Sequence, residues 1–332
     1  MKAAVIESFG GPEVLVYRDI PDPVAGPGEV VVDVHAASVN AADWKVRQGG
    51  YSQKAFPYVL GRDFSGVVAA LGDGVDDLAV GDEVFGVCET HIEGAYAEKL
   101  AIAAPIVARR RVELSHVETA AVALTGLTAL ISLEECLRLR AGETILVQGG
   151  AGGVAGFAIQ LAKHLGARVI TTASERNHDY VRRLGADEII DYQHDDFRAL
   201  GKTCDAVFDT VGGDVALHSF EVLKPGGRAA FIASGAGAPK SPRSDLSALR
   251  PAVARDRPHL ERVLELVVSG VVMLPEITTY PLAQAAQAHR VSEGRHLRGK
   301  LVLEVRQAAA DGGGTGPAHQ QAGVGEGTTT RR

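Results

Sequence analysis

A glycine-rich turn that separates a short apolar run from a helical pattern constrains this chain more than any other stretch. Residues 145–147 (Ile-Leu-Val) have the composition of a buried parallel strand, and apolar residues recur with helical spacing over 157–165. Between them, Gly150, Gly152 and Ala155 form the pattern G-x-G-x-x-A. A strand, a tight turn and a helix in this order predict a site that binds a dinucleotide.

Each small residue of the turn is expected to have its own structural role. We expect Gly150 to permit the sharp turn, Gly152 to let a pyrophosphate approach the backbone, and Ala155 to let the helix pack close to the strand. The N–H groups at the helix N-terminus, around Gly153 and Val154, would then face the phosphate charge. The alternative is an ordinary glycine-rich turn, since the chain contains 39 glycines. The flanking strand and helix favour the cofactor.

The composition is that of an ordinary globular enzyme with room for two domains. Of 332 residues, 46% are hydrophobic, and 34 basic against 41 acidic residues give a net charge of −7. This balance provides no general basic field for nucleic acid or anionic lipid, so neither partner is expected. The three cysteines form no CxxC pair, which favours a reduced compartment. Because Glu7 comes too early for a signal peptide and no apolar run is long enough to span a bilayer, we expect a cytoplasmic protein that does not enter a membrane.

The pattern of elements changes along the chain and predicts an α/β protein. Residues 1–118 contain short apolar runs joined by Gly- and Pro-rich turns, typical of a β-rich module. Residues 119–257 alternate strands with helices, which predicts a doubly wound parallel sheet covered on both faces. Residues 258–306 contain too few elements for a domain and are expected to rejoin the first module. The polar, glycine-rich segment 307–332 is typical of a disordered tail.

The expected elements of the second module follow one another regularly. A mostly helical run over 117–136 is expected to be interrupted near Thr125-Gly126. Strands are then expected at 144–148, 168–172, 188–191, 205–208 and 228–232, with helices at 153–166, 176–184 and 214–223.

Several segments, in the same order, are similar to one enzyme family. They are 39–45 (VNAADWK), 60–68 (LGRDFSGVV), 81–86 (GDEVFG), 124–129 (LTGLTA), the glycine turn, 184–187 (LGAD), 223–228 (LKPGGR) and 298–303 (RGKLVL). On these segments the chain resembles the medium-chain dehydrogenase/reductase superfamily, and within it the zinc-independent quinone oxidoreductase group. The resemblance implies a GroES-like catalytic domain split around a Rossmann domain, with the active site in the cleft between them. It departs from the family at Ala155, where a third glycine is usual. We also expect a homodimer.

The resemblance implies that the site holds no metal. Zinc-dependent relatives place a catalytic Cys where this chain has Asn40 and a His where it has Arg62. A guanidinium cannot ligate zinc, and an amide is a poor ligand. The four-cysteine loop expected after about residue 90 is absent, and Cys88 with His91 are too few for a tetrahedral site.

The end of the second Rossmann strand favours NADPH over NADH. NAD-binding Rossmann domains place Asp or Glu there to bind the ribose hydroxyls, and Ser174 occupies that position. Its hydroxyl can donate to a 2′-phosphate, and Arg176 can pair with that phosphate. Glu175 would repel the phosphate if it points inward but has no effect if it points to solvent. The alternative for Arg176 is a solvated position on the first turn of a helix.

The resemblance implies further contacts to the cofactor. They are Thr128 near the nicotinamide ribose, Tyr192 beside the adenine, Val211, Ile232 and Ser234 at strand ends that face the crevice, and Arg298 and Lys300 on the pyrophosphate side. For the two basic residues, a surface position is the alternative.

Residues 240–257 carry a local excess of positive charge. Five basic residues (Lys240, Arg243, Arg250, Arg255 and Arg257) outnumber two acidic ones (Asp245 and Asp256) there. The segment follows Ile232–Ser234, so we expect it near the mouth of the crevice. A positive rim there would attract NADPH or an anionic acceptor, whereas an ordinary solvated loop is the alternative.

A nicotinamide without a metal restricts the possible acceptors. Such a site cannot polarise an isolated carbonyl as zinc does, whereas quinones and α,β-unsaturated carbonyls spread the charge that a hydride leaves. We therefore expect hydride transfer from NADPH to a small-molecule quinone or enone. The resemblance implies that Asn40, Tyr51 and Asp63 come from segments lining the cleft. Tyr51 is the expected donor to the acceptor, Asn40 orders the nicotinamide and substrate, and Asp63 either contributes to the site or orients the backbone.

Two other functions stay open at this stage. An enoyl-thioester reductase of a biosynthetic pathway would use the same hydride addition on a different acceptor. A non-catalytic protein that binds NADPH would keep the glycine turn but would oxidise the cofactor with no acceptor.

Overall fold

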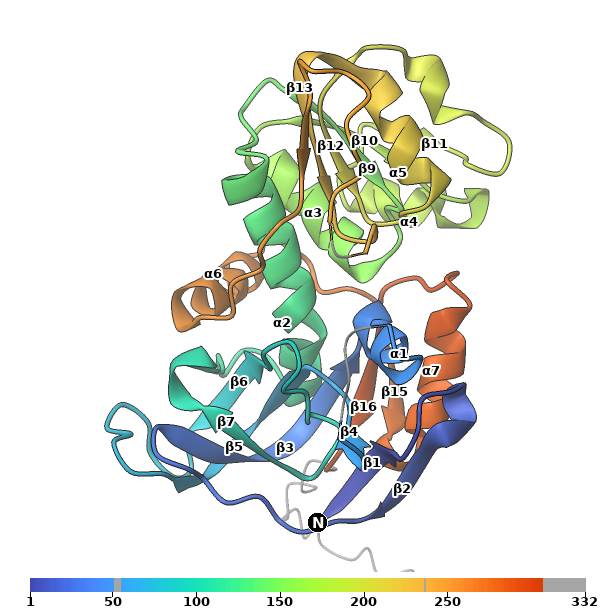
Figure 1. Cartoon of the computed structure of the whole chain (residues 1–332). Coiled ribbons are helices and arrows are strands. Elements are labelled where there is room, and N and C mark those ends of the chain that lie inside the picture. The colour runs from blue at the N-terminus through green and yellow to red at the C-terminus, as the bar shows by residue number, and fades with distance from the viewer. Residues whose placement is uncertain (51–54, 236, 307–332) are drawn as a thin grey trace, which may run out of the picture.

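Segments near both ends of the described chain build one half of the molecule (Figure 1). In the computed structural model, which describes residues 1–50, 55–235 and 237–306, this half contains a seven-stranded sheet of order β15-β16-β3-β5-β6-β8, with β7 paired to β3. A three-stranded sheet of order β2-β1-β4 lies beside it. The strands are β1 (Lys2–Ile6), β2 (Leu15–Asp19), β3 (Glu29–Val39), β4 (Tyr58–Val59), β5 (Asp63–Leu71), β6 (Glu83–Val87), β7 (Lys99–Ala103), β8 (Val107–Arg109), β15 (Ile277–Pro281) and β16 (Lys300–Glu304).

The other half is a six-stranded parallel sheet of order β11-β10-β9-β12-β13-β14 with helices on both faces. Side chains alternate along β9, so Ile145 and Val147 pack with helix α3 on one face while Leu146 packs with α5 on the other. The predicted fold class, a doubly wound sheet beside a β-rich module, is confirmed. The elements are β9 (Thr144–Gln148), α3 (Gly153–His164), β10 (Arg168–Thr172), α4 (His178–Arg183), β11 (Glu188–Ile190), β12 (Cys204–Asp209), α5 (Asp214–His218), β13 (Leu223–Phe231) and β14 (Ser247–Leu249).

The remaining helices lie between or beside the two sheets. They are α1 (Ala41–Arg47), α2 (His116–Leu130), α6 (Arg257–Val268) and α7 (Ala285–Glu293), and a π-helical segment over Ile131–Cys136 extends α2. Short 3-10 turns cover Pro12–Val14, Ala104–Ile106, Glu175–Asn177, Phe197–Leu200, Ser219–Val222 and Leu282–Gln284.

Helix α2 connects the two halves, and the expected interruption at Thr125-Gly126 is wrong. The hydroxyls of Thr125 and Thr128 donate to carbonyls one turn earlier, so neither competes with the helix. Gly126 is required by packing, because a Cβ there would lie 2.4 Å from Cγ1 of Val263 on α6. With its extension the helix is 21 residues long and, by length and composition alone, apolar enough to cross a bilayer. However, 78% of the 18-residue stretch that meets this criterion is buried inside the protein, as in the core helix of a globular protein.

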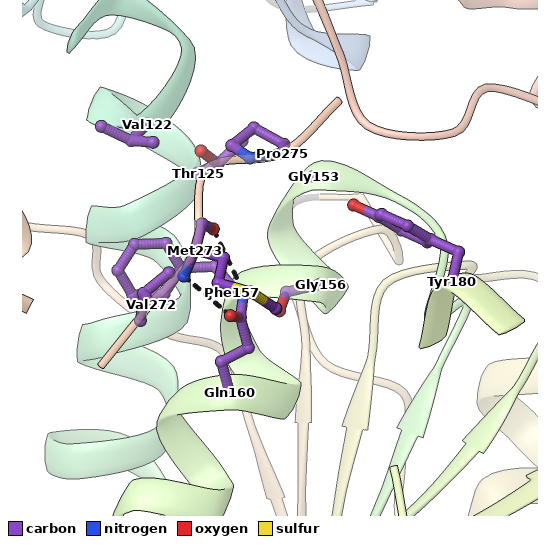
Figure 2. A pocket seen from close by; sticks show the side chains of 10 residues that line it. All are labelled: Val122, Thr125, Gly153, Gly156, Phe157, Gln160, Tyr180, Val272, Met273 and Pro275. Atoms are coloured by element: carbon purple, nitrogen blue, oxygen red, sulfur yellow. Dashed lines mark hydrogen bonds between the residues drawn. The ribbon is translucent and has the colours of Figure 1, made fainter. Parts of the chain in front are cut away.

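Two hydrogen bonds connect the segment after α6 to helix α3. Gln160 accepts a hydrogen bond from the backbone N–H of Met273 (2.8 Å) and donates one to the carbonyl of the same residue (3.3 Å), as Figure 2 shows. The chain then returns to the first sheet, where β16 pairs with β3 so that Leu301 lies opposite Val39. Residues from the end of the described chain therefore reach the end of β3, directly before Asn40.

A buried polar network fixes α1, the helix that follows Asn40, against α7. Asp43 accepts hydrogen bonds from the N–H of Asn40 (2.8 Å) and the hydroxyl of Tyr96 (2.9 Å). His289 bridges that hydroxyl (3.2 Å) and the guanidinium of Arg47 (3.0 Å). Because Arg47 donates to Nδ1, His289 is neutral and carries its proton on Nε2. Burial and the charge of Arg47 lower the pKa of His289 to about 3.

We predict that His289 makes stability depend on pH. An unfolded histidine titrates near pH 6.5, so between that pH and about 3 the unfolded state binds more protons and stability falls on acidification, by up to about 1.4 kcal/mol per pH unit. Denaturant unfolding from pH 7.5 to 4.5 should show a steeper loss for the wild type than for His289→Gln. Asp43, whose pKa burial raises to about 6, acts in the opposite direction in both proteins. Parallel stability curves would contradict the assignment.

Candidate functional site

A cavity of about 810 Å³ lies between the two halves and is within the size range of small-molecule sites. The glycine turn and the ends of β10, β12 and β13 line it from one side, and Asn40 with α1 lines it from the other. The small pocket drawn in Figure 2, behind the turn, measures about 10 Å³ and has room for no more than a water molecule.

The strand, turn and helix are as expected, but the individual glycines of the turn have different structural roles from those predicted. The positive φ of the turn falls on Gly149 (+77°), so the expectation that Gly150 permits the turn is wrong. Gly150 instead packs on β10, where a Cβ would lie 2.3 Å from Oγ1 of Thr171, and it does not line the cavity. Gly152 is the N-cap of α3, and a Cβ there would have only Gly149 O nearby, at 3.5 Å. The backbone at Gly152 is therefore open to a ligand.

Most of the site residues predicted from the sequence lie around this one cavity. Those that line it are Asn40, Thr128, Gly152, Gly153, Val154, Ala155, Ser174, Arg176, Tyr192, Val211, Ile232 and Lys300. Tyr51 and the tail 307–332 lie outside the described residues.

Besides Gly150, two predicted cofactor residues, Arg298 and Ser234, do not line the cavity. Arg298 pairs with Glu276 (2.6 Å), and its guanidinium lies 5.7 Å from the ring centroid of Tyr180, so its charge is engaged on the outer surface. Ser234 donates its hydroxyl hydrogen bond to the carbonyl of Gly237 (2.8 Å). The resemblance implied that Ser234 lies at a strand end facing the crevice and Arg298 on the pyrophosphate side, but each side chain pairs with another partner.

The end of β10 is suited to a phosphorylated ribose. Ser174 is buried and accepts a hydrogen bond from Asn177 (3.2 Å), which also lines the cavity. Arg176 lines the cavity and donates to the carbonyl of His296 (3.3 Å). Glu175 is exposed and does not line the cavity, so its carboxylate lies outside the space that a 2′-phosphate would occupy.

Lys300 does not face a pyrophosphate, because its ammonium group is bound to the end of β3. It donates to the carbonyl of Val39 (2.8 Å) and to Oδ1 of Asn40 (2.5 Å). With that oxygen held, the buried NH2 group of Asn40 interacts with the carboxylate of Asp63 and lowers the pKa of that carboxyl. The arrangement holds the amide of Asn40 in one orientation in the wall of the cavity.

Asp63 lies next to Lys300 and Asn40. It is fully buried and does not line the cavity, so the expectation that it contributes directly to the site is wrong. Its carboxylate accepts a hydrogen bond from Ser38. Burial raises its pKa, whereas the positive charge of Lys300 opposes that shift, and burial lowers the pKa of Lys300 in turn. The buried charges of Asp63 and Lys300 attract each other, and both residues contact the amide of Asn40.

The positions of the two zinc ligands in related dehydrogenases do not suit a metal here. Arg62 is buried and donates to Glu93 (3.1 Å), so a guanidinium cation already occupies this ligand position. The nearby Cys88 is also buried, and burial raises the pKa of its thiol. Within the described residues, no three His, Cys, Asp or Glu side chains gather as a metal site requires. Zinc chemistry does not fit this site.

Sequence reasoning missed several residues that line the cavity. They are Lys45, Thr125, Gly149, Thr172, Asn177, Thr210 and Arg295. Lys45 stands in a recognised segment and could have been noticed there, while Arg295 gives no local signal. Of the positive segment 240–257, Arg250 and Arg255 line the cavity, whereas Arg243 and Arg257 pair with Asp245 and Asp77 elsewhere.

Comparison with known proteins decides the family. Residues 26–110 match the alcohol dehydrogenase GroES-like domain, and residues 184–303 match the zinc-binding dehydrogenase domain. A quinone oxidoreductase from Pseudomonas aeruginosa is 34% identical over 317 residues, which cover 89% of this chain and 97% of that protein. The chain belongs to the medium-chain dehydrogenase/reductase superfamily, in its quinone oxidoreductase group.

Other members of the superfamily extend the likeness. A chloroplastic NADPH-dependent alkenal/one oxidoreductase from Arabidopsis thaliana is 33% identical, over 91% of this chain and 79% of that one. The structure of Escherichia coli quinone oxidoreductase complexed with NADPH superimposes with a TM-score of 0.85 at 27% identity, covering 92% of this chain and 100% of that one. A polyketide synthase from Mycobacterium tuberculosis contains a segment 34% identical over 309 residues, but the chain spans only 14% of its length.

We predict that Arg176→Ala weakens NADPH binding by about 10- to 100-fold and leaves NADH binding nearly unchanged, since a hydrogen bond to a charged group contributes about 1.5–3 kcal/mol. Fluorescence titration of both cofactors would measure this. Glu175→Gln is the matched control and should change either affinity by less than about 3-fold, because Glu175 lies outside the cavity. Equal losses for both cofactors in Arg176→Ala would mean that Arg176 does not contact the 2′-phosphate.

Proposed function

We propose that this chain transfers a hydride from NADPH to a small quinone or α,β-unsaturated carbonyl. One observation carries the proposal: the open N-terminus of α3 and the oriented amide of Asn40 share a single cavity. The first suits the pyrophosphate of a dinucleotide, and the second suits an oxygen that gains negative charge. A site with both can bind a cofactor and stabilise a reduced acceptor.

The residues around the cavity fit NADPH along its length. Ser174 and Arg176 would hold the 2′-phosphate, with Tyr192 beside the adenine. The backbone from Gly152 to Ala155 would hold the pyrophosphate, since nothing but a carbonyl lies near the missing Cβ of Gly152. Thr128, Val211 and Ile232 would contact the nicotinamide end. When bound, NADPH supplies the hydride.

The protein's own contribution is to orient the acceptor and stabilise its charge. A conjugated acceptor becomes an enolate or hydroquinone anion when it gains a hydride, and the N–H of the Asn40 amide that does not serve Asp63 would donate to that oxygen. Lys300 and Asp63 keep the amide in this orientation. Tyr51 stays the proposed second donor. A charge-delocalising acceptor needs no metal, in agreement with Asn40 and Arg62 at the ligand positions.

The names of the relatives support this function and one alternative. Proteins named quinone oxidoreductase and NADPH-dependent alkenal/one oxidoreductase align along most of the chain. The matching segment of a polyketide synthase supports an enoyl-thioester reductase as the second candidate, because hydride addition to an enoyl thioester uses the same site.

The quaternary and cellular setting follow as further parts of the proposal. We propose a soluble, cytoplasmic homodimer, which light scattering would test. We also propose the domain division 1–118, 119–257 and 258–306, in which β16 returns to the first sheet while α6 packs on α2.

We predict that the purified protein oxidises NADPH rapidly with simple quinones and enones, and more slowly with enoyl thioesters. Absorbance at 340 nm with a panel of these three acceptor classes would measure it. Activity should survive a chelator. Tight NADPH binding with no oxidation by any acceptor would indicate the non-catalytic alternative, and a thioester faster than every quinone and enone would favour the biosynthetic one.

We predict that Lys300→Met lowers kcat with an enone by about 10-fold or more, because the freed amide of Asn40 can rotate and lose its donor geometry. Removing one donor to a developing oxyanion costs up to about 3–4 kcal/mol. The loss with a quinone should be smaller, since quinones react faster. Arg298→Met removes a neighbouring charge outside the cavity and serves as the control. Unchanged kcat in folded Lys300→Met, whatever the change in its melting temperature, would contradict this role.

A further inference from the structure

The wall of the cavity is strongly positive. Among the described residues that line it, seven are Lys or Arg and none is Asp or Glu, although the whole chain has a net charge of −7. A concentration of one sign in a cleft of an otherwise acidic protein indicates an anionic ligand. The seven are Lys45, Arg62, Arg176, Arg250, Arg255, Arg295 and Lys300.

Four of these charges already have a partner or a proposed ligand. Lys300 holds Asn40, and Arg62 is paired with Glu93. Arg255 lies 3.5 Å from a carboxylate oxygen of Glu89, and Arg176 is assigned to the 2′-phosphate. Lys45, Arg250 and Arg295 make no ion pair within the described part of the chain.

These three residues come from different elements and converge. Lys45 belongs to α1, Arg250 follows β14, and Arg295 follows α7 in a left-handed conformation (φ +54°). The ring of Trp44 lies 5.6 Å from Nζ of Lys45 and 5.5 Å from Cζ of Arg295. Burial, together with the positive charges of Arg295 and Arg250, lowers the pKa of Lys45. Both guanidinium groups therefore lie close enough to repel the ammonium group of Lys45.

The cluster belongs to the acceptor end of the cavity. Nη1 of Arg250 donates to the carbonyl of Phe231 (2.7 Å), next to Ile232, which is assigned to the nicotinamide end. Lys45 stands on the helix that begins directly after Asn40. The phosphates of NADPH are assigned elsewhere, to the N-terminus of α3 and to Ser174 with Arg176.

We infer that the natural acceptor carries an anionic group, a carboxylate or a phosphate, separate from its conjugated carbonyl and bound by Lys45, Arg250 and Arg295. This inference rests on the proposed function and specifies its acceptor. Without an anion the two guanidinium groups repel the ammonium group of Lys45, and an anion between them removes that repulsion. An acceptor anchored in this way would place its conjugated carbon beside the nicotinamide and its oxygen at Asn40.

Paired quinones test the inference. The rate constant kcat/KM would be measured with 1,4-naphthoquinone and with its 2-sulfonate, for the wild type and for the double variant Lys45→Gln/Arg250→Gln. Comparing each variant with the wild type on the same quinone cancels the difference in intrinsic reactivity. We expect a loss of at least 10-fold with the sulfonate and no more than about 3-fold with the uncharged quinone. Arg290→Gln, an exposed charge on α7 outside the cavity, should change neither.

Binding can be followed without turnover, because Trp44 is the only tryptophan of the chain. Quenching of its fluorescence should give a dissociation constant for the sulfonated quinone at least 10-fold weaker in the double variant. Equal losses with both quinones, accompanied by weaker NADPH binding, would assign the cations to the cofactor and overturn the inference. Unchanged rates and affinities would overturn it too. In both cases wild-type reduction of the quinones would leave the proposed function intact, whereas sulfonate binding without reduction of either quinone would contradict the proposed function alone.

Discussion

The antiparallel pairing of β16 with β3 is the contact on which the site depends. It places Leu301 opposite Val39 and so brings Lys300 to the residue at which β3 ends. Lys300 then reaches both the carbonyl of Val39 and the side chain of Asn40. Asp63 interacts with the same amide from within the N-terminal part of the chain. The orientation of Asn40 in the cavity wall therefore also depends on a residue 260 positions away in the sequence.

Burying the charges of Lys300 and Asp63 beside Asn40 costs free energy. Lys300 and Asp63 are both almost inaccessible to water, and burial disfavours the charged form of each. Their opposite charges offset part of this penalty, and the hydroxyl of Ser38 satisfies one carboxylate oxygen. Replacing either partner alone would leave an uncompensated buried charge, which costs about 3–5 kcal/mol in other proteins.

The parts of the fold that the sequence predicted well are those in which local pattern and packing agree. The strand before the turn and the helix after it follow from nearest-neighbour apolar spacing. The roles of the individual glycines did not, since the positive φ falls on Gly149 while Gly150 packs against Thr171 of another strand. Thr125 and Gly126 have weak helix propensity, yet contact with Val263 from α6 overrides it. Arg298 does not line the cavity, because it forms an ion pair with Glu276. No sequence motif indicates this ion pair.

The contact between the glycine turn and the segment before β16 has a mechanical consequence. Gly152 forms a β-bridge with Gly299, and the N–H of Gly299 donates to the carbonyl of Ala151 (3.0 Å). A side chain at position 299 is excluded, because a Cβ would lie 2.0 Å from the carbonyl oxygen of Glu276. The two halves are thus fastened by main chain at one edge of the crevice. A rotation of one half against the other that kept these main-chain contacts would therefore move the opposite edge of the crevice furthest.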